Sequence, residues 1–135
     1  MSENLDLVRT IYADWEQGDW SSAAWAHPEI EYVMVDEPGK RIVTGLAAMT
    51  DAWRAFLSSW TDYRVEPVEY RELDDERIFV LVRALGRGAA SGLDIVSVGP
   101  ARHGLNLFHV RDGKVIRLTA YFDAQRGLAD LGLAE

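Results

Sequence analysis

Two polar side chains lie within apolar segments and are candidates for chemistry. Asn106 is placed in GLNLFHV, where an amide between two leucines costs stability unless it has a hydrogen-bond partner. Its N–H groups can donate to a carbonyl oxygen of a ligand, or simply to a neighbouring backbone group. Asp94 lies in LDIVSV, where burial would raise its pKa and make it a general acid or base near neutral pH. At a solvent-exposed sheet edge, Asp94 would have no such role.

Neither metal nor thiol chemistry is expected. The chain has no cysteine, and His27, His103 and His109 lack the His-x-His or i, i+4 spacing of a zinc site. We therefore expect no metal and no cofactor. His103 and His109 have the strand parity opposite to that of Asn106, which predicts that both histidines lie on the other, outer face of the sheet.

The charge and hydropathy of the chain exclude several classes of partner. A formal net charge of −8, with Arg83, Arg87 and Arg102 spread apart, argues against nucleic acid and acidic membranes. No apolar run reaches the roughly 18 residues of a membrane span, and the polar start MSENLDLVRT is no secretory signal. The length predicts one domain, residues 1–135, which we expect in the cytoplasm.

Apolar residues spaced by three and four predict the helices. The first contains Leu5, Val8, Tyr12 and Trp15 and ends near Gly18. A short second helix is expected over 20–26, closed by the proline of HPEIEY. A third helix is predicted from the apolar series Leu46, Met49, Trp53, Phe56 and Trp60.

Most of the remaining chain is predicted to form a sheet. EIEYVMV alternates, with Ile30, Tyr32 and Met34 on one side. Asp112-Gly113 predicts a hairpin turn. Further strands are expected over 63–73, 77–85, 93–98, 102–110 and 115–122, and a last helix over 124–133, capped by Asp123. Helices followed by consecutive antiparallel strands indicate the α+β class, with helices on one face of a bent sheet.

The order of these segments resembles a known superfamily. The matching pieces are the first helix ending in GDW, the strand start HPEIEY, the tryptophan-rich helix, and FHVRDGKVIRLTAYFD with the terminal GLADLGL. Together they resemble nuclear transport factor 2-like proteins, in particular SnoaL-like and ketosteroid-isomerase-like members. The resemblance implies a cone-shaped, curved antiparallel or mixed sheet around three N-terminal helices, with a short C-terminal helix. Because that superfamily includes isomerases, cyclases, hydrolases, dehydratases and non-catalytic binders, the resemblance implies no single reaction.

The resemblance also implies positions for functional groups. The aspartic acid that donates to an oxyanion in ketosteroid isomerases falls on Asn106, whose amide is also a donor. The isomerase base falls near Met34, with Asp36 two residues further on as a substitute in another register. The acid–base aspartate of SnoaL-like cyclases falls on Ala120. Neither of these two carboxylates is therefore present at its expected position.

The isomerase tyrosine falls on Ile11, with Tyr12 beside it but rotated by about 100° around the helix axis. Aromatic and apolar side chains are expected to line a cavity inside the curved sheet. The expected lining residues are Tyr12, Trp15, Tyr32, Met34, Trp53, Phe56, Trp60, Phe108, Ala120 and Phe122.

Three functions stay open at this point. In the first, an isomerase, cyclase or hydratase acts on a hydrophobic carbonyl or epoxide, with Asn106 polarising the oxygen and Asp94 or Asp36 moving the proton. In the second, the domain binds an apolar metabolite without catalysis. In the third, it is a structural dimer whose outer sheet face carries Leu105 and Tyr121. A homodimer through that outer face is expected in each case.

Overall fold

The computed structural model describes residues 3–17, 24–35, 41–58, 60–88, 103–121 and 124–132. At positions 56, 60–64, 84–88 and 103 it describes the backbone but not the side chain. The elements in chain order are α1 (Glu3–Glu16), β1 (Ala26–Met34), β2 (Arg41–Thr44), α2 (Leu46–Leu57), β3 (Trp60–Glu72), β4 (Arg77–Gly88), β5 (His103–Arg111), β6 (Lys114–Tyr121) and α3 (Ala124–Asp130).

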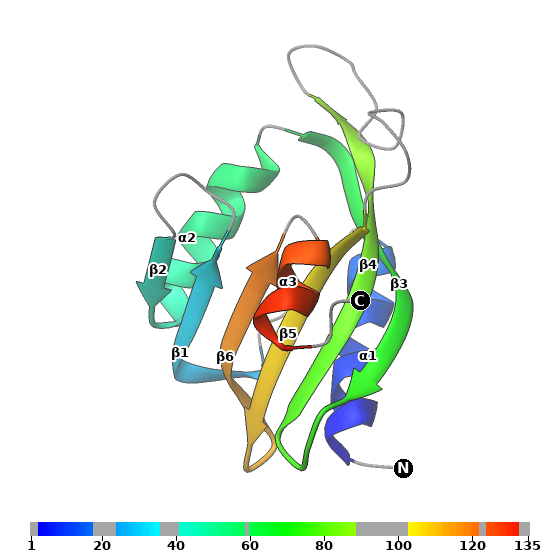
Figure 1. Cartoon of the computed structure of the whole chain (residues 1–135). Helices are drawn as coiled ribbons and strands as arrows, with labels where there is room; N and C mark the ends of the chain where they lie inside the picture. Colours follow the sequence, from blue (N-terminus) through cyan, green and yellow to red (C-terminus); the bar gives the residue numbers. More distant parts are fainter. Residues whose placement is uncertain are drawn as a thin grey trace.

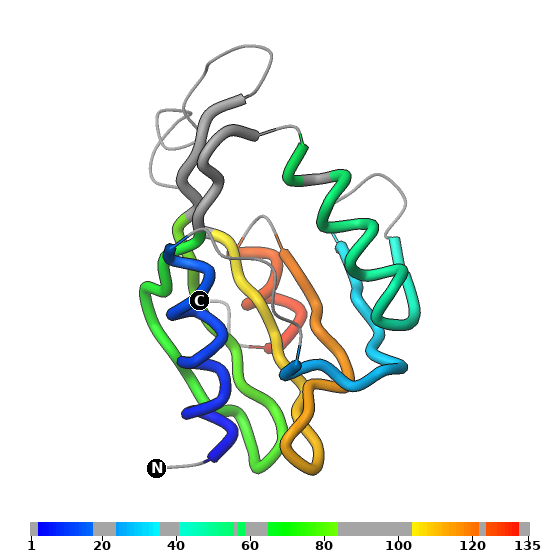
Figure 2. The backbone as a smooth tube through the Cα atoms, turned by 180° about the vertical axis from the view of Figure 1, so that it is seen from behind, coloured from blue at the N-terminus to red at the C-terminus, as the bar shows by residue number. Residues whose placement is uncertain are grey.

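The six described strands form one mixed sheet in the order β2-β1-β6-β5-β4-β3. β1 pairs with β6 in parallel, and the other neighbouring strands are antiparallel. The sheet is curved, with α1 and α2 on one face and α3 on the other (Figure 1, Figure 2). The predicted α+β class, the mixed sheet and the short C-terminal helix are confirmed. Among the described residues, no helix is long and apolar enough to span a membrane.

Apolar periodicity explains which residues meet in the core. On α1, Val8, Ile11, Tyr12 and Trp15 are buried, as their spacing predicts. They pack against the helix-facing side of the sheet, together with side chains from the central strands. A second, smaller core lies on the opposite face, between the sheet and α3. The sheet is therefore apolar on both faces, and each face has its own helical cover.

Strand alternation places the residues of β1 as predicted. Ile30 is fully buried in the core under α1 and α2, and Tyr32 packs against the same core. Val33 and Val35 belong instead to the core under α3. The hairpin between β5 and β6 also has its predicted geometry, since Asp112 and Gly113 both have positive φ, 52° and 76°.

Two predicted helices extend too far towards their C-terminal ends. The sequence predicts a helix over 20–26, but Trp25 lies in a turn and β1 begins directly after it. The backbone N–H of Val115 donates to the carbonyl of Trp25 at 2.9 Å, so pairing with β6 captures this segment. Trp60, expected on a helix, begins β3 instead, because α2 ends three residues earlier at Leu57.

Other predictions lie outside the described residues. These are the helix stop at Gly18, the strand over 93–98 and the cap at Asp123.

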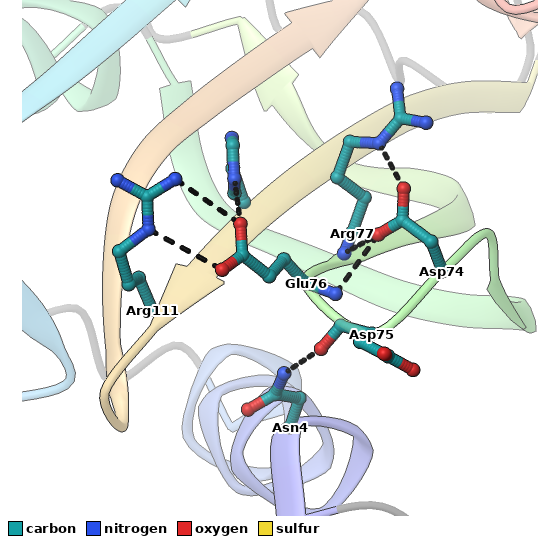
Figure 3. Close-up of polar contacts among 7 residues, drawn as sticks. Asn4, Asp74, Asp75, Glu76, Arg77 and Arg111 are labelled. Carbon is teal, nitrogen blue, oxygen red and sulfur yellow. Dashed lines mark hydrogen bonds and ion pairs between the residues drawn. The ribbon is translucent and has the colours of Figure 1, made fainter.

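The turn between β3 and β4 is organised by one carboxylate. Asp74 accepts hydrogen bonds from the backbone N–H groups of Glu76 at 2.9 Å and Arg77 at 2.8 Å, and from the Arg77 Nε at 2.7 Å (Figure 3). These bonds, the one from the Glu76 backbone foremost, lower the pKa of Asp74 from 3.8 to about 2. The aspartate thereby closes the turn and neutralises the arginine that follows it.

The same turn connects α1 to β5. The Asn4 side chain donates to the carbonyl of Asp75 at 2.8 Å, and Val110 N–H donates to the carbonyl of Glu76 at 2.7 Å. The Glu76 carboxylate accepts from Arg111, and its Oε1 lies 2.9 Å from Nε2 of His109 (Figure 3). The hydrogen bond from Arg111 and then that with His109 lower the pKa of Glu76.

Replacing Asp74 by asparagine should remove an acid-sensitive part of the stability. Asparagine keeps the turn's backbone bonds but loses the charge beside Arg77. Because folding lowers the pKa of Asp74 from 3.8 to about 2, its contribution is complete above pH 4 and is lost as the pH falls through about 2. Thermal melts should show the wild type above the variant at pH 6, with the gap closing between pH 4 and pH 2. A gap that stays constant over this range contradicts the assignment.

Candidate functional site

The strand register brings the predicted site residues into two neighbouring rows across the sheet. The first row runs from Met34 through Ala120 to Asn106, then through Val80 to Tyr70. Directly opposite residues on paired strands point to the same face, which here is the face that α1 and α2 cover. The second row, one pair further along the strands, contains Tyr32, Leu118, Phe108 and Ile78.

Asn106 forms a hydrogen bond with a helix that lies far away in the sequence. Its Nδ2 donates to the hydroxyl oxygen of Tyr12 on α1, at 2.7 Å. The Tyr12 side chain is fully buried, whereas Asn106 is half-buried. Ile11, on which the resemblance places the tyrosine, packs into the core instead. The residue beside it therefore supplies the hydroxyl, and the amide has the partner that its apolar surroundings require.

Three aromatic rings hold the ring of Tyr12. Its centroid lies 5.0 Å from Trp15, 6.0 Å from Tyr70 and 5.8 Å from Phe108, with interplanar angles of 75–83°. Such edge-to-face contacts fix a ring more tightly than contact with aliphatic groups alone. Because the three rings come from α1, β3 and β5, they lock the direction in which the Tyr12 hydroxyl points.

A second aromatic group continues from Trp15 towards α2. The ring of Trp53 lies 5.5 Å from Trp15 and 5.9 Å from Tyr32, and it is stacked on Trp25 at 5.8 Å. Trp53 and Tyr32 are half-buried, while Trp15 and Trp25 are buried. These aromatic residues therefore form one connected cluster on the helix-facing side of the sheet, and their contact with a ligand stays a prediction.

Tyr70 is a site residue that sequence reasoning missed. It ends the row that contains Asn106, and the guanidinium of Arg9 lies 5.3 Å from its ring centroid. Burial raises the pKa of Tyr70, the negative charge of Glu16 raises it further, and Arg9 opposes both. The register of β3 shifts between Pro67 and Glu69, so simple alternation along YRVEPVEYREL does not indicate the face of Tyr70.

The described part of this site contains no buried charge. Thr119 is the only buried polar or charged residue among those the structure describes. Met34 and Ala120, the two positions that the resemblance associates with carboxylates, are buried and neutral. No cluster of three histidine, aspartate or glutamate side chains within the described ranges could hold a metal ion. The polar groups that the described part of the site offers are therefore the amide of Asn106 and the hydroxyl groups of the tyrosines.

Several predicted site residues lie outside the described part. Asp36, Asp94 and Phe122 are not described, and neither are the side chains of Phe56 on α2 and Trp60 on β3. The predicted roles of these five residues stay predictions.

Part of the outer face of the sheet is covered by α3 of the same chain. Leu105 is fully buried and Tyr121 is 7% exposed, and α3 packs over both. The Tyr121 hydroxyl donates to the carboxylate of Asp130 at 3.1 Å. His109, predicted on this outer face, pairs with Glu76 of its own chain. The homodimer stays a prediction, which light scattering at micromolar concentration tests.

Replacing Tyr12 by phenylalanine should destabilise the protein by about 1–3 kcal/mol, because an N–H of Asn106 then loses its partner. The matched variant is Asn106→Leu, which removes the other half of the pair. In urea denaturation, the double variant should lose less stability than the sum of the two single losses. Additive losses would show that the two groups do not interact.

Comparison with known proteins agrees with this architecture. Residues 8–118 match the model of the SnoaL-like domain. None of the curated proteins compared with the chain matches it. A nuclear transport factor 2-like protein of unknown function from Burkholderia pseudomallei K96243 is 18% identical, with a TM-score of 0.75 over 96% of this chain and 97% of that one.

Two further solved structures have the same fold. A proposed SnoaL-like polyketide cyclase from Jannaschia sp. CCS1 is 13% identical, with a TM-score of 0.73 over 87% of this chain and 83% of its own. TerC, crystallised with polyporic acid, is 20% identical, with a TM-score of 0.70 over 98% of each chain. At these identities the similarity establishes the fold. The match over 8–118 goes further, and it shows that the chain belongs to the SnoaL-like domain family.

Proposed function

We propose that this domain binds a hydrophobic small molecule with a carbonyl or epoxide oxygen, and that Asn106, held in place by Tyr12, binds and polarises that oxygen. The reaction would be a cofactor-independent isomerisation, cyclisation or hydration. The observation that carries the proposal is the 2.7 Å hydrogen bond between Asn106 and Tyr12 beside a cluster of aromatic rings. Membership of a family whose structural relatives include a proposed polyketide cyclase supports it.

The Asn106 amide, oriented by its bond to Tyr12, suits an oxygen on which negative charge develops. An amide donates a hydrogen bond without carrying a charge, and a pre-oriented donor in apolar surroundings stabilises a developing oxyanion by about 3–4 kcal/mol. Asparagine also stays a donor at every pH, unlike an aspartic acid at the same position. The apolar neighbours Ala120 and Val80, at 8% and 0% exposure, keep water away from the flanks of Asn106.

Proton transfer needs a further group. The described residues place no carboxylate in the row of Asn106, so we assign the acid–base role to Asp94 or Asp36. A positioned acid or base contributes about 10²–10⁴-fold to a rate.

Turnover of a panel of small hydrophobic ketones and epoxides tests this function. The double variant Asn106→Leu, Asp94→Asn should lose at least about 100-fold in kcat/KM. Asp51→Asn is the matched control, because it changes an exposed aspartate on α2 that pairs only with Arg54 among the described residues. Equal rates for the wild type and the double variant would refute the enzymatic function.

A second candidate, non-catalytic binding, is favoured by one observation. Met34 and Ala120, where the resemblance places family carboxylates, are 5% and 8% exposed and cannot transfer protons. A binder of apolar metabolites needs only the aromatic cluster and the Asn106–Tyr12 pair. Thermal shift against a lipophilic library separates the two functions. Stabilising compounds that are recovered chemically unchanged favour binding, whereas their conversion favours the enzyme.

A further inference from the structure

We propose that the ligand of Asn106 carries a hydrogen-bond donor beside its carbonyl oxygen, as lactams and enolised dicarbonyl compounds do. This inference rests on the proposed function, because it specifies the chemical group that the same site recognises. It follows from the hydrogen-bonding groups that Asn106 retains after its contact with Tyr12.

An asparagine side chain has two N–H donors and one carbonyl acceptor. The bond from Nδ2 to Tyr12 uses one donor. The second N–H and Oδ1 remain, and they lie in one plane because the amide is planar. Asn106 therefore offers a ligand one donor and one acceptor rather than two donors.

The oxygen of the Asn106 amide is unpaired and not fully buried. Among the described residues, Oδ1 of Asn106 has no hydrogen-bond partner, and no side-chain oxygen or nitrogen there is both buried and unpaired. Oδ1 is therefore not fully buried, in agreement with the half-buried side chain. A ligand that covers Asn106 has to satisfy this oxygen or leave it unpaired.

The neighbours of Asn106 cannot satisfy it in place of the ligand. Ala120 and Val80 flank it on the paired strands, and Met34 lies beyond Ala120. All three side chains are apolar and buried. A plain ketone would engage only the remaining N–H, and a carboxylate would place a negative oxygen against Oδ1. A neutral group with adjacent donor and acceptor satisfies both atoms, provided that the N–H left by Tyr12 is the one on the Oδ1 side of the amide.

Three bicyclic compounds of nearly equal size test this inference. 2-Quinolone has an N–H beside its carbonyl, coumarin has a ring oxygen in place of that N–H, and naphthalene has neither group. Isothermal titration of the full chain should give 2-quinolone an affinity about tenfold or more above that of coumarin, because coumarin leaves Oδ1 unpaired. Coumarin should in turn bind more tightly than naphthalene.

Two variants assign the preference to Asn106. In Asn106→Leu the preference for 2-quinolone over coumarin should disappear. Asn106→Asp, of the same size, provides a second variant if leucine disturbs folding. Its carboxylate has no N–H for the carbonyl but still accepts from the lactam N–H, so coumarin should lose more affinity than 2-quinolone.

The outcomes separate this inference from the proposed function. Equal affinities for 2-quinolone and coumarin, both above that of naphthalene, overturn the inference and leave oxygen binding intact. A preference for 2-quinolone that survives in Asn106→Leu, or one that disappears in Asn106→Asp, also overturns it, since another residue then contacts the donor. If 2-quinolone binds no better than naphthalene, both the inference and the proposed oxygen recognition fail.

Discussion

Replacing Phe108 by alanine should lower the free energy of unfolding by about 3–5 kcal/mol. Phe108 on β5 is fully buried, and its ring contacts Tyr12 at 5.8 Å and Trp15 at 6.3 Å between centroids. Truncation removes these contacts and leaves a cavity that the rigid neighbouring rings fill poorly. The loss should also loosen Tyr12, and with it the hydroxyl that Asn106 contacts.

Urea denaturation measures this effect. Val68→Ala is the matched control, since Val68 is 54% exposed and its truncation should change stability by no more than about 0.5 kcal/mol. Phe108→Leu should fall between the alanine variant and the wild type, because leucine refills most of the space. A loss below about 1 kcal/mol for the alanine variant would contradict the central position of Phe108 in the core.

Replacing Gly127 by alanine should destabilise the protein by about 1–3 kcal/mol, although the same change in an exposed helix is stabilising. A Cβ atom at Gly127 would lie 3.0 Å from the ring of Tyr121 and 3.2 Å from Leu105. Neither neighbour can easily give way, because Leu105 is fully buried and the Tyr121 hydroxyl is bonded to Asp130. Helix α3 would have to lift from the outer face of the sheet.

Whether Gly127→Ala raises or lowers the free energy of unfolding is the result that tests this packing. Ala129→Ser alters an exposed position of the same helix and should stay within about 0.5 kcal/mol of the wild type in the same denaturation experiment. Hydrogen exchange should be faster in α3 of Gly127→Ala than in α3 of the control. A stabilised Gly127→Ala protein would show that α3 does not pack closely on Tyr121 and Leu105.

Local patterns predict much of this fold because many elements have one apolar face. The alternation of Ile30, Tyr32 and Met34 correctly predicts which side of β1 faces the helices. The Asp112-Gly113 pair correctly predicts the last hairpin, since both residues adopt positive φ. In these cases the local preference and the tertiary environment favour the same conformation.

The wrong predictions arise where pairing with distant residues overrides local preference. The alanine- and tryptophan-rich segment before HPEIEY favours a helix locally, but Trp25 accepts a backbone hydrogen bond from Val115 of β6. Trp60 continues the helical spacing of α2, yet its backbone pairs with Gly88 of β4. A contact with a strand that follows much later cannot be derived from the periodicity of one segment.

In the site, too, local patterns predict some features and contacts with distant residues determine the others. Strand parity correctly places Asn106 on the helix-facing side of the sheet, because that argument needs only the alternation along β5. Its partner Tyr12 is 94 residues away, and the contact depends on how α1 is rotated against the sheet. The position of Tyr70 in the row of Asn106 depends in addition on the register shift between Pro67 and Glu69 in β3. Rotations and bulges are set by packing, which no single segment encodes.

Side-chain amide signals in an NMR titration test the central claim most directly. The chain contains only two asparagines, Asn4 and Asn106, so selective ¹⁵N labelling of asparagine gives two side-chain NH₂ groups, each with its own pair of signals. With 2-acetylnaphthalene as the probe, the Asn106 signal should shift and saturate. The Asn4 signal, whose amide donates to Asp75, should stay in place. An Asn106 signal that does not move while the probe binds would contradict the account.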